Sequence, residues 1–139
     1  MKNLENLLEK KLSDDMGKII LRFTLGFLML LHGYSKLVNG IDGIIMRLVN
    51  DGFPELLAYG VYVGEIIAPI MIIMGLFTRI SSAIYAFTMF FAIYIAHSSD
   101  VFTINEKSGG SVIELQLLFM FGAIALMFLG AGKYSVDKK

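Results

Sequence analysis

The stretch IILRFTLGFLMLLHGYSKLV, residues 19–38, has the length and apolar character of an α-helix that crosses the hydrocarbon core of a bilayer. It nevertheless contains three basic residues, Arg22, His32 and Lys36. At about 100° per residue, these three fall on one side of a helix. Because hydrocarbon does not solvate basic groups, we expect the rest of the chain to bring polar groups to that side.

The composition favours a membrane protein. The 139 residues are 56% hydrophobic and 17% charged, whereas a soluble domain has about 25% charged residues. The apolar residues gather in four blocks, each close to the roughly 20 residues that one span needs. We therefore predict an all-α fold, a polytopic membrane four-helix bundle in one domain (residues 17–132), with spans at about 18–38, 54–77, 79–97 and 111–130.

Two shorter segments carry amphipathic patterns. In residues 1–16, Leu4, Leu7, Leu8 and Leu12 form one helical stripe opposite charged residues, which predicts an amphipathic helix on the membrane surface. A frayed polar tail is the alternative. Residues 41–51 are too short to span a bilayer and predict an interfacial helix after the first span. Residues 133–139 are polar and form the predicted cytoplasmic tail.

The charge pattern predicts an orientation and excludes some functions. Most lysines and arginines flank the two termini or the 77–79 turn, and only Lys36, Arg47 and Lys107 belong to the opposite side. By the positive-inside rule, both termini are expected in the cytoplasm, with membrane lipids around the bundle. The 12 basic and 12 acidic residues balance, which argues against a nucleic-acid partner, and the absence of cysteine excludes thiol chemistry.

Glu65 is the polar residue that is hardest to explain by packing alone. It lies near the middle of the second span, on the same helix as the small residues Gly60, Gly64 and Ala68. Pro69 follows four residues later and has no N–H, so the carbonyl of Glu65 loses its helical partner. A carboxyl group at the midplane needs a partner or a proton. We therefore expect a carboxyl and a free carbonyl at one buried point.

The other candidate residues can be placed by depth, at about 1.5 Å per residue. Near the outer end of the bundle we expect His32, Lys36, His97 and Glu114, with Glu65 below them and Arg22 nearest the cytoplasmic end. These six form the predicted ligand site or buried polar network, with His32 paired to Glu65.

Several of the six have a simpler structural role. Lys36 and Arg22 could extend their side chains to the outer and inner headgroups. Glu114 could form a capping box with Ser111 at the start of the fourth span. His97 could be a solvated residue at a helix end.

An ordered set of motifs resembles the DoxX family of small four-span integral membrane proteins. The pattern R-x3-G-x5-HG-x2-K of the first span is followed by Glu65, a GLxTR turn, Glu114 and a glycine-rich ending. The matching residues are Arg22, Gly26, His32, Gly33, Lys36, Glu65, Gly75, Leu76, Thr78, Arg79, Glu114, Gly130, Gly132, Lys133, Tyr134, Ser135 and Asp137.

The resemblance implies a four-helix bundle in the bacterial inner membrane. The family is similar to the small-subunit type of thiosulfate:quinone oxidoreductase, and some relatives are linked to membrane redox complexes and oxidative stress. A quinone is therefore a candidate cofactor. A role in catalysis would make the chain a quinone-linked component of an oxidoreductase.

Three functions remain open from the sequence. The first is a redox-linked subunit that binds a quinone-like or small anionic ligand among the helices and works with a redox partner subunit. The second is a non-catalytic scaffold or accessory subunit whose buried charges fix helix register. The third is a proton or small-solute pathway, which a homo-oligomer would form. No metal site is expected, because His32, His97 and Glu114 lack a ligand motif.

Overall fold

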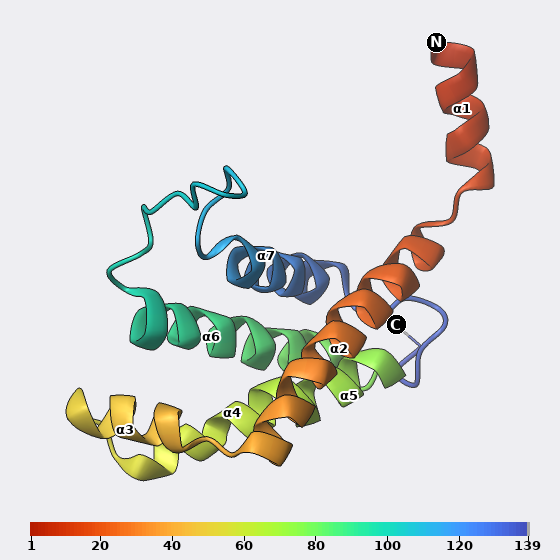
Figure 1. The fold of residues 1–139 in the computed structure, drawn as a ribbon. Helices are drawn as coiled ribbons and strands as arrows, with labels where there is room; N and C mark the ends of the chain where they lie inside the picture. The colour runs from red at the N-terminus through yellow and green to blue at the C-terminus, as the bar shows by residue number, and fades with distance from the viewer. Residues whose placement is uncertain (139) are drawn as a thin grey trace.

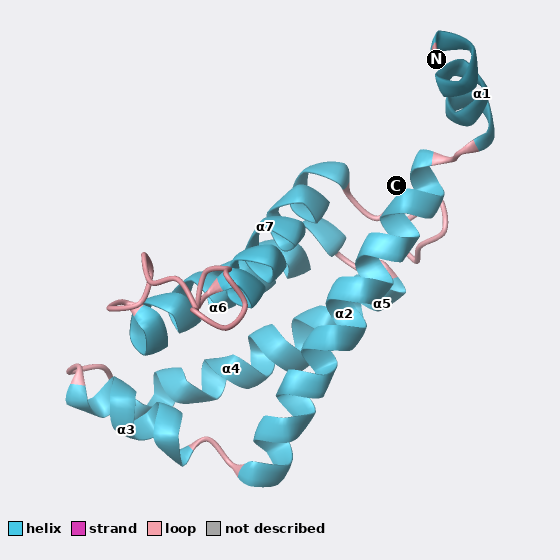
Figure 2. Ribbon diagram, turned by 45° about the horizontal axis from the view of Figure 1, so that its top comes forward, coloured by secondary structure: helices cyan, strands magenta, loops and turns pink. Residues whose placement is uncertain are grey.

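The computed structural model describes residues 1–138, and within that range the chain is helical with connecting turns and loops, which confirms the predicted all-α fold. Figure 2 shows these helices and the loops between them. The elements are α1 (Lys2–Lys11), α2 (Asp14–Asn39), α3 (Asp42–Asn50), η1 (Glu55–Tyr59), α4 (Gly60–Tyr62), η2 (Val63–Ile67), α5 (Ala68–Met74), α6 (Thr78–His97) and α7 (Glu114–Leu129).

Four helical stretches pack around one core. Helix α2 contacts α5, η2 and α7, and α6 contacts α5, η2 and α7, so each stretch has two neighbours (Figure 1). The core side chains include Met29 of α2, Ile72 of α5, Tyr85 of α6 and Leu126 of α7, all buried. The hydroxyl of Tyr85 donates a hydrogen bond to the carbonyl of Leu25 at 3.1 Å, which ties α6 to α2 through the core.

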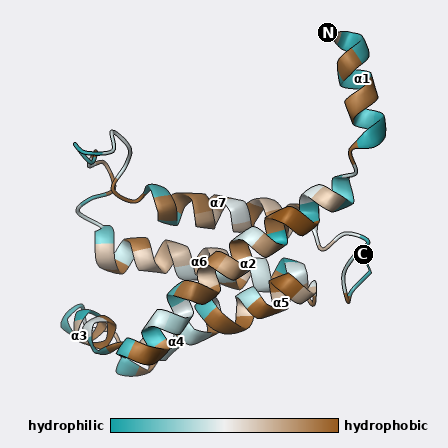
Figure 3. Ribbon diagram, turned by 45° about the vertical axis from the view of Figure 1, so that its right-hand side comes forward, coloured by the Kyte–Doolittle hydropathy of each residue, from teal (hydrophilic) through white to brown (hydrophobic). Residues whose placement is uncertain are grey.

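Three of the four stretches have the length and composition of a membrane span, namely 14–39, 55–74 and 78–97. The fourth, α7, is apolar but has 16 residues and rises about 24 Å, less than the ~30 Å hydrocarbon core. It begins at Glu114, three residues after the start of the predicted fourth span. Figure 3 shows that α7 is largely hydrophobic and that the loop before it is more polar.

The second span changes its helical pitch along its length. A 3-10 turn at η1 leads through α4 into the π-helix η2, where the N–H of Ala68 donates to the carbonyl of Val63, five residues back. Pro69 explains this widening, because its ring clashes with the carbonyl four residues earlier and it has no N–H to donate. The predicted loss of the hydrogen bond to the Glu65 carbonyl is thus accommodated by a π-helical turn.

Helix α1 stands apart from the bundle, whereas helix α3 packs against it. Helix α1 projects from the bundle and buries none of its residues, so its predicted place on a membrane surface stays a prediction (Figure 1). Helix α3 buries Leu48 in a second apolar cluster with Ile41 and Ala58, beside aromatic residues of the 53–62 segment and α6. The short helix predicted for residues 41–51 is therefore packed onto the bundle.

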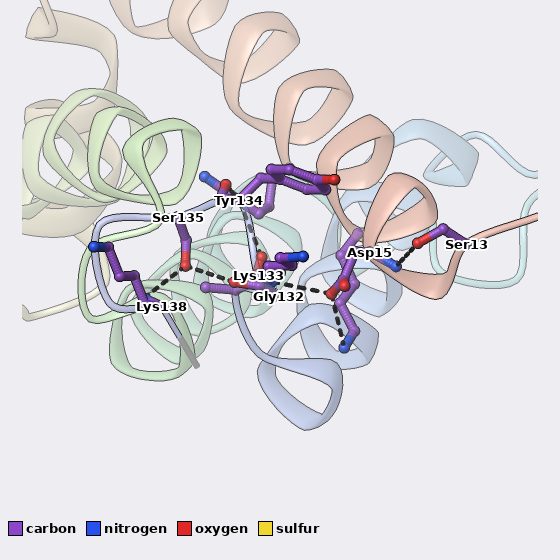
Figure 4. Close-up of polar contacts among 10 residues, drawn as sticks. Ser13, Asp15, Gly132, Lys133, Tyr134, Ser135 and Lys138 are labelled. Atoms are coloured by element: carbon purple, nitrogen blue, oxygen red, sulfur yellow. Dashed lines mark hydrogen bonds and ion pairs between the residues drawn. The ribbon is translucent and has the colours of Figure 1, made fainter.

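The start of α2 and the C-terminal segment lie at the same end of the bundle. The Asp15 carboxylate accepts a hydrogen bond from the backbone N–H of Lys133 at 3.0 Å, as Figure 4 shows. Further along, the N–H groups of Val136 and Asp137 donate to the carbonyls of Met74 and Gly75. The C-terminal segment is therefore a strap across the ends of α2 and α5.

Candidate functional site

A cavity of about 1000 Å³ lies between the second half of α2, α3, the 57–65 segment, α6 and the beginning of α7. Its wall is mainly aliphatic and aromatic. Its polar side chains come from five different parts of the chain and include His32, Lys36, Arg47, Glu65, Thr88, His97 and Gln116. An apolar cavity with a few polar groups is the usual form of a small-molecule site.

Glu65 and Lys36 form an ion pair on the wall of this cavity. The Glu65 side chain is 3% exposed and accepts from the Lys36 ammonium through Oε1, whereas the Lys36 side chain is 29% exposed. Across residues 1–138, Glu65 Oε2 meets no hydrogen-bond donor. The predicted pairing of Glu65 with His32 is therefore wrong. The four methylenes of Lys36 let its ammonium reach back from one turn further along α2.

Two glycines explain why the Glu65 backbone is buried so tightly. A Cβ on Gly33 of α2 would lie 2.5 Å from the Glu65 carbonyl oxygen, so only a glycine admits this approach. On the other side, a Cβ on Gly64 would collide with the side chain of Thr88 in α6. Helices α2 and α6 therefore close around η2 and hold Glu65 in place. Gly64 belongs to the small-residue stripe predicted from the sequence, and Gly33 to the HG pair of the first span.

His32 lines the cavity but takes a different partner from the one predicted. Its ring meets Phe119 of α7 edge-on, with ring centroids 5.9 Å apart and an interplanar angle of 83°. The residue is exposed within the single chain, facing the cavity. His32 is therefore available to a molecule in the cavity.

His97 closes α6 at the rim of the cavity. Its Nε2 lies 3.3 Å from Nε2 of Gln116, and its Nδ1 lies 3.9 Å from a carboxylate oxygen of Asp100. The structure thus gives His97 partners from its own loop and from α7. It remains a wall residue of the cavity and is only partly exposed.

Arg22 lies away from the cavity, and its side chain has a structural role. The buried guanidinium donates to four backbone carbonyls, at 2.9 Å to Ile72, 2.6 Å to Ile73, 3.0 Å to Ala131 and 2.7 Å to Tyr134. The first two are carbonyls at the end of α5, and the other two belong to the C-terminal strap. The predicted polar compartment does not extend to Arg22, whose side chain ties the strap to the bundle.

Glu114 is also outside the cavity wall. It is exposed at the first residue of α7, and its carboxylate folds against Gly110 in the preceding loop. The predicted capping box is wrong in detail, because Ser111 Oγ accepts from the N–H of Ile113 rather than from that of Glu114. Of the six predicted residues, the cavity brings together Lys36, Glu65, His32 and His97.

Sequence reasoning missed three polar residues of the wall, namely Arg47, Thr88 and Gln116. Arg47 of α3 donates to the carbonyl of Ala96 at 3.0 Å, which fastens α3 to the end of α6. Gln116 lies one turn from the cavity-facing Phe119, a spacing that could have been recognised once α7 was known to face the cavity. Among residues 1–138, no group of three or more His, Cys, Asp or Glu side chains is placed to hold a metal ion.

The family model described as DoxX matches residues 17–98, a range that contains the Lys36–Glu65 pair and most of the cavity wall. This chain belongs to the DoxX family. The sequence-based identification is therefore confirmed. Membership of the DoxX family, together with the apolar helices, identifies a membrane protein.

Two curated relatives extend over most of the chain. It is 28% identical to the protein named "Putative oxidoreductase CatD" of Bacillus subtilis (strain 168), over 90% of this DoxX chain and 87% of the relative. It is 30% identical to an uncharacterized protein of Haemophilus influenzae (strain ATCC 51907 / DSM 11121 / KW20 / Rd), over 86% and 87% of the two chains. No solved structure matches the chain significantly.

Proposed function

We propose that this DoxX protein binds a quinone-like amphiphile in the cavity, with the polar head of the ligand at Lys36 and Glu65, as a redox-linked membrane subunit. One observation carries the proposal. A buried carboxylate, Glu65, is paired with a lysine whose side chain is 29% exposed, and both residues line a large apolar cavity. The partly exposed Lys36 ammonium can therefore contact a molecule in the cavity, whereas Glu65 is the buried group that holds the ammonium in place.

The dimensions of the cavity suit such a ligand. Its volume of about 1000 Å³ is at the upper end of the range for small-molecule sites. Side chains such as Phe87, Phe91 and Ile95 offer an apolar surface to an aromatic ring and a hydrocarbon tail. The relative named as an oxidoreductase points in the same direction.

The residues of the wall supply hydrogen bonds and proton exchange. Lys36 has further N–H donors beyond the one given to Glu65, and these can hold an oxygen of the ligand. His32 faces the cavity, and its imidazole can accept a proton from a bound head group or donate one to it. A bound quinone would supply two-electron chemistry. Because the chain has no cysteine, we propose that the electrons come from a redox partner subunit.

The test uses the purified protein in lipid nanodiscs with a short-chain ubiquinone. The proposal predicts a rise in melting temperature that saturates with ligand. The matched variant is Lys36→Met with Glu65→Met, which removes both charges together and avoids an unpaired buried one. It should fold and lose the ligand-dependent rise. No rise in the wild type, with a loss of stability in the variant, would support a scaffold role for the pair instead.

We also propose a bacterial inner-membrane location with both termini in the cytoplasm, because the lysine-rich ends lie together at one end of the bundle. The cysteine-free sequence allows a direct test. In intact cells, an impermeant maleimide should label a Ser108→Cys variant and leave a Lys138→Cys variant unlabelled. The opposite pattern would reverse the orientation.

A further inference from the structure

The cavity reaches the surface of the bundle between the second span and α6. On the second span, Leu57, Gly60 and Val63 line the cavity and are also exposed on the outside of the single chain. On α6, the same is true of Phe87. Because residues of two facing helices belong both to the cavity wall and to the outer surface, the cavity is open between them. We call this the lateral opening, with Gly60 and Val63 on one edge and Phe87 on the other.

Close packing limits the lateral opening in both directions along α6. Toward α5, a Cβ on Gly64 would collide with Thr88, so the second span and α6 touch at that level. In the other direction, α3 contacts both η1 and α6. At about 1.5 Å per residue, Thr88 lies about 14 Å from the end of α6 at His97. Since the hydrocarbon core is ~30 Å thick, the lateral opening faces lipid tails rather than water.

The edges of the lateral opening are apolar. Gly60 and Val63 carry no polar side-chain atom, and Phe87 stacks on Phe91 with ring centroids 6.1 Å apart and an interplanar angle of 14°. The hydroxyl of Thr88, at the closed end, donates within α6. The charged and amide side chains of the wall come from α2, α3, η2, α7 and the last residue of α6, namely His32, Lys36, Arg47, Glu65, His97 and Gln116. A ligand therefore meets polar groups inside the cavity and apolar groups at the lateral opening.

We infer that the ligand has a long hydrocarbon tail, which leaves the cavity through the lateral opening and lies in the bilayer, while its head stays at Lys36. The inference rests on the proposed function, because it places the tail of the same ligand. A Cβ on Gly60 would meet no atom within 4 Å, so packing does not require this glycine, and its small size leaves room for the tail. The apolar edges stabilise the tail by burying its surface. The ligand therefore belongs to the long-tailed quinones dissolved in the membrane, and a compact water-soluble quinone lacks this contact.

The test places a blocking group at one edge of the lateral opening. Because a Cβ fits at Gly60 and the chain has no cysteine, Gly60→Cys provides a single thiol. The purified variant is capped either with a small methylthio group or with a bulky pyrenylmaleimide, and is then placed in nanodiscs. Phe121→Cys, capped in the same two ways, is the matched control, because Phe121 is exposed on α7 and does not line the cavity.

The experiment measures dissociation constants by calorimetry, with empty nanodiscs as the blank. The probes are decylubiquinone and the analogue that carries a methyl group in place of the decyl tail. At Gly60, the pyrenyl cap should weaken decylubiquinone roughly tenfold relative to the methylthio cap, which corresponds to the lost burial of about two methylene groups. The methyl analogue should change by less than about twofold, and both probes should be insensitive to the cap at Phe121. In the wild type, ubiquinone with a decaprenyl tail should bind as tightly as decylubiquinone, because the excess tail lies in the bilayer.

The outcomes separate this inference from the proposed function. If the pyrenyl cap at Gly60 leaves decylubiquinone unchanged, or weakens both probes equally, the inference is wrong and the proposed function stands. If no probe binds the wild type, both are wrong. If Gly60→Cys does not fold, Val63→Cys on the same edge replaces it. If the variants or the methyl analogue give no binding signal, the decaprenyl ubiquinone decides: tight binding to the wild type supports the inference, and rejection overturns it.

Discussion

Replacing Arg22 by methionine should release the C-terminal strap and destabilise the whole bundle. The substitution keeps an apolar chain of similar length but removes the donors to four carbonyls. Interhelical hydrogen bonds in membrane proteins are worth about 0.6–1.7 kcal/mol, and bonds to charged groups in soluble proteins about 1.5–3. At about 1 kcal/mol for each bond, Arg22→Met should lower the free energy of unfolding by about 4 kcal/mol.

Arg79→Met is the matched control for this prediction. Arg79 also donates to carbonyls at a helix end, those of Met127 and Phe128, but it is exposed and makes two such bonds. We expect its loss to cost about 1 kcal/mol, because water replaces exposed hydrogen bonds at little cost.

The assay for both variants is equilibrium unfolding in mixed detergent micelles, followed by far-ultraviolet circular dichroism. Trypsin cleavage after Lys133 provides a second readout, and it should accelerate in Arg22→Met because the strap loses its anchor. If Arg22→Met were no more destabilising than Arg79→Met, and Lys133 stayed protected, the structural role of Arg22 would be refuted.

Three further results follow from the contacts around Glu65 and from the contact between α3 and α6. Gly33→Ala should destabilise the protein by about 2 kcal/mol in the same unfolding assay, because the added Cβ would collide with the Glu65 carbonyl. The control Gly43→Ala should be neutral or slightly stabilising, because a Cβ at Gly43 would meet no atom within 4 Å. Equal effects of the two substitutions would contradict the close approach of α2 to Glu65. Lys36→Met alone should lower the free energy of unfolding by about 3–5 kcal/mol, because it leaves the buried Glu65 carboxylate unpaired. The double variant with Glu65→Met should lose less. If the effects of the two single substitutions simply added in the double variant, the two residues would not act as a pair. Arg47→Gln should speed ligand dissociation several-fold in stopped-flow measurements, because α3 forms part of the cavity wall and loses its hydrogen bond to α6. An unchanged rate would show that this hydrogen bond does not retain the ligand.

The sequence predicted the helices well because hydropathy and length determine which segments can cross a bilayer. It also located Glu65 correctly as a buried group, since a carboxyl in the middle of an apolar span has to turn toward polar neighbours inside the bundle. The pitch of that span was harder to predict. Pro69 indicated a lost hydrogen bond, but whether the helix kinks or widens into a π-turn depends on how tightly Gly33 and Gly64 let its neighbours approach.

The partners of the charged residues could not be predicted from depth alone. Depth placed His32 nearer to Glu65 than Lys36, but the rotation of α2 turns the His32 ring toward Phe119 and leaves the longer Lys36 side chain to reach the carboxylate. The partners of Arg22 are backbone carbonyls. Every residue carries such a carbonyl, so no sequence pattern identifies the ones that accept.

The central claim is that the cavity, rather than the surrounding lipid, holds the quinone-like ligand. The chain has no tryptophan, so a single introduced tryptophan is a unique fluorescent reporter that a nearby quinone quenches. Phe87 lines the cavity and Phe121 does not, although the two are similarly exposed, at 65% and 60%. With decylubiquinone in nanodiscs, Phe87→Trp should show saturable quenching and Phe121→Trp quenching that rises linearly with quinone. Linear quenching at both positions would contradict the claim.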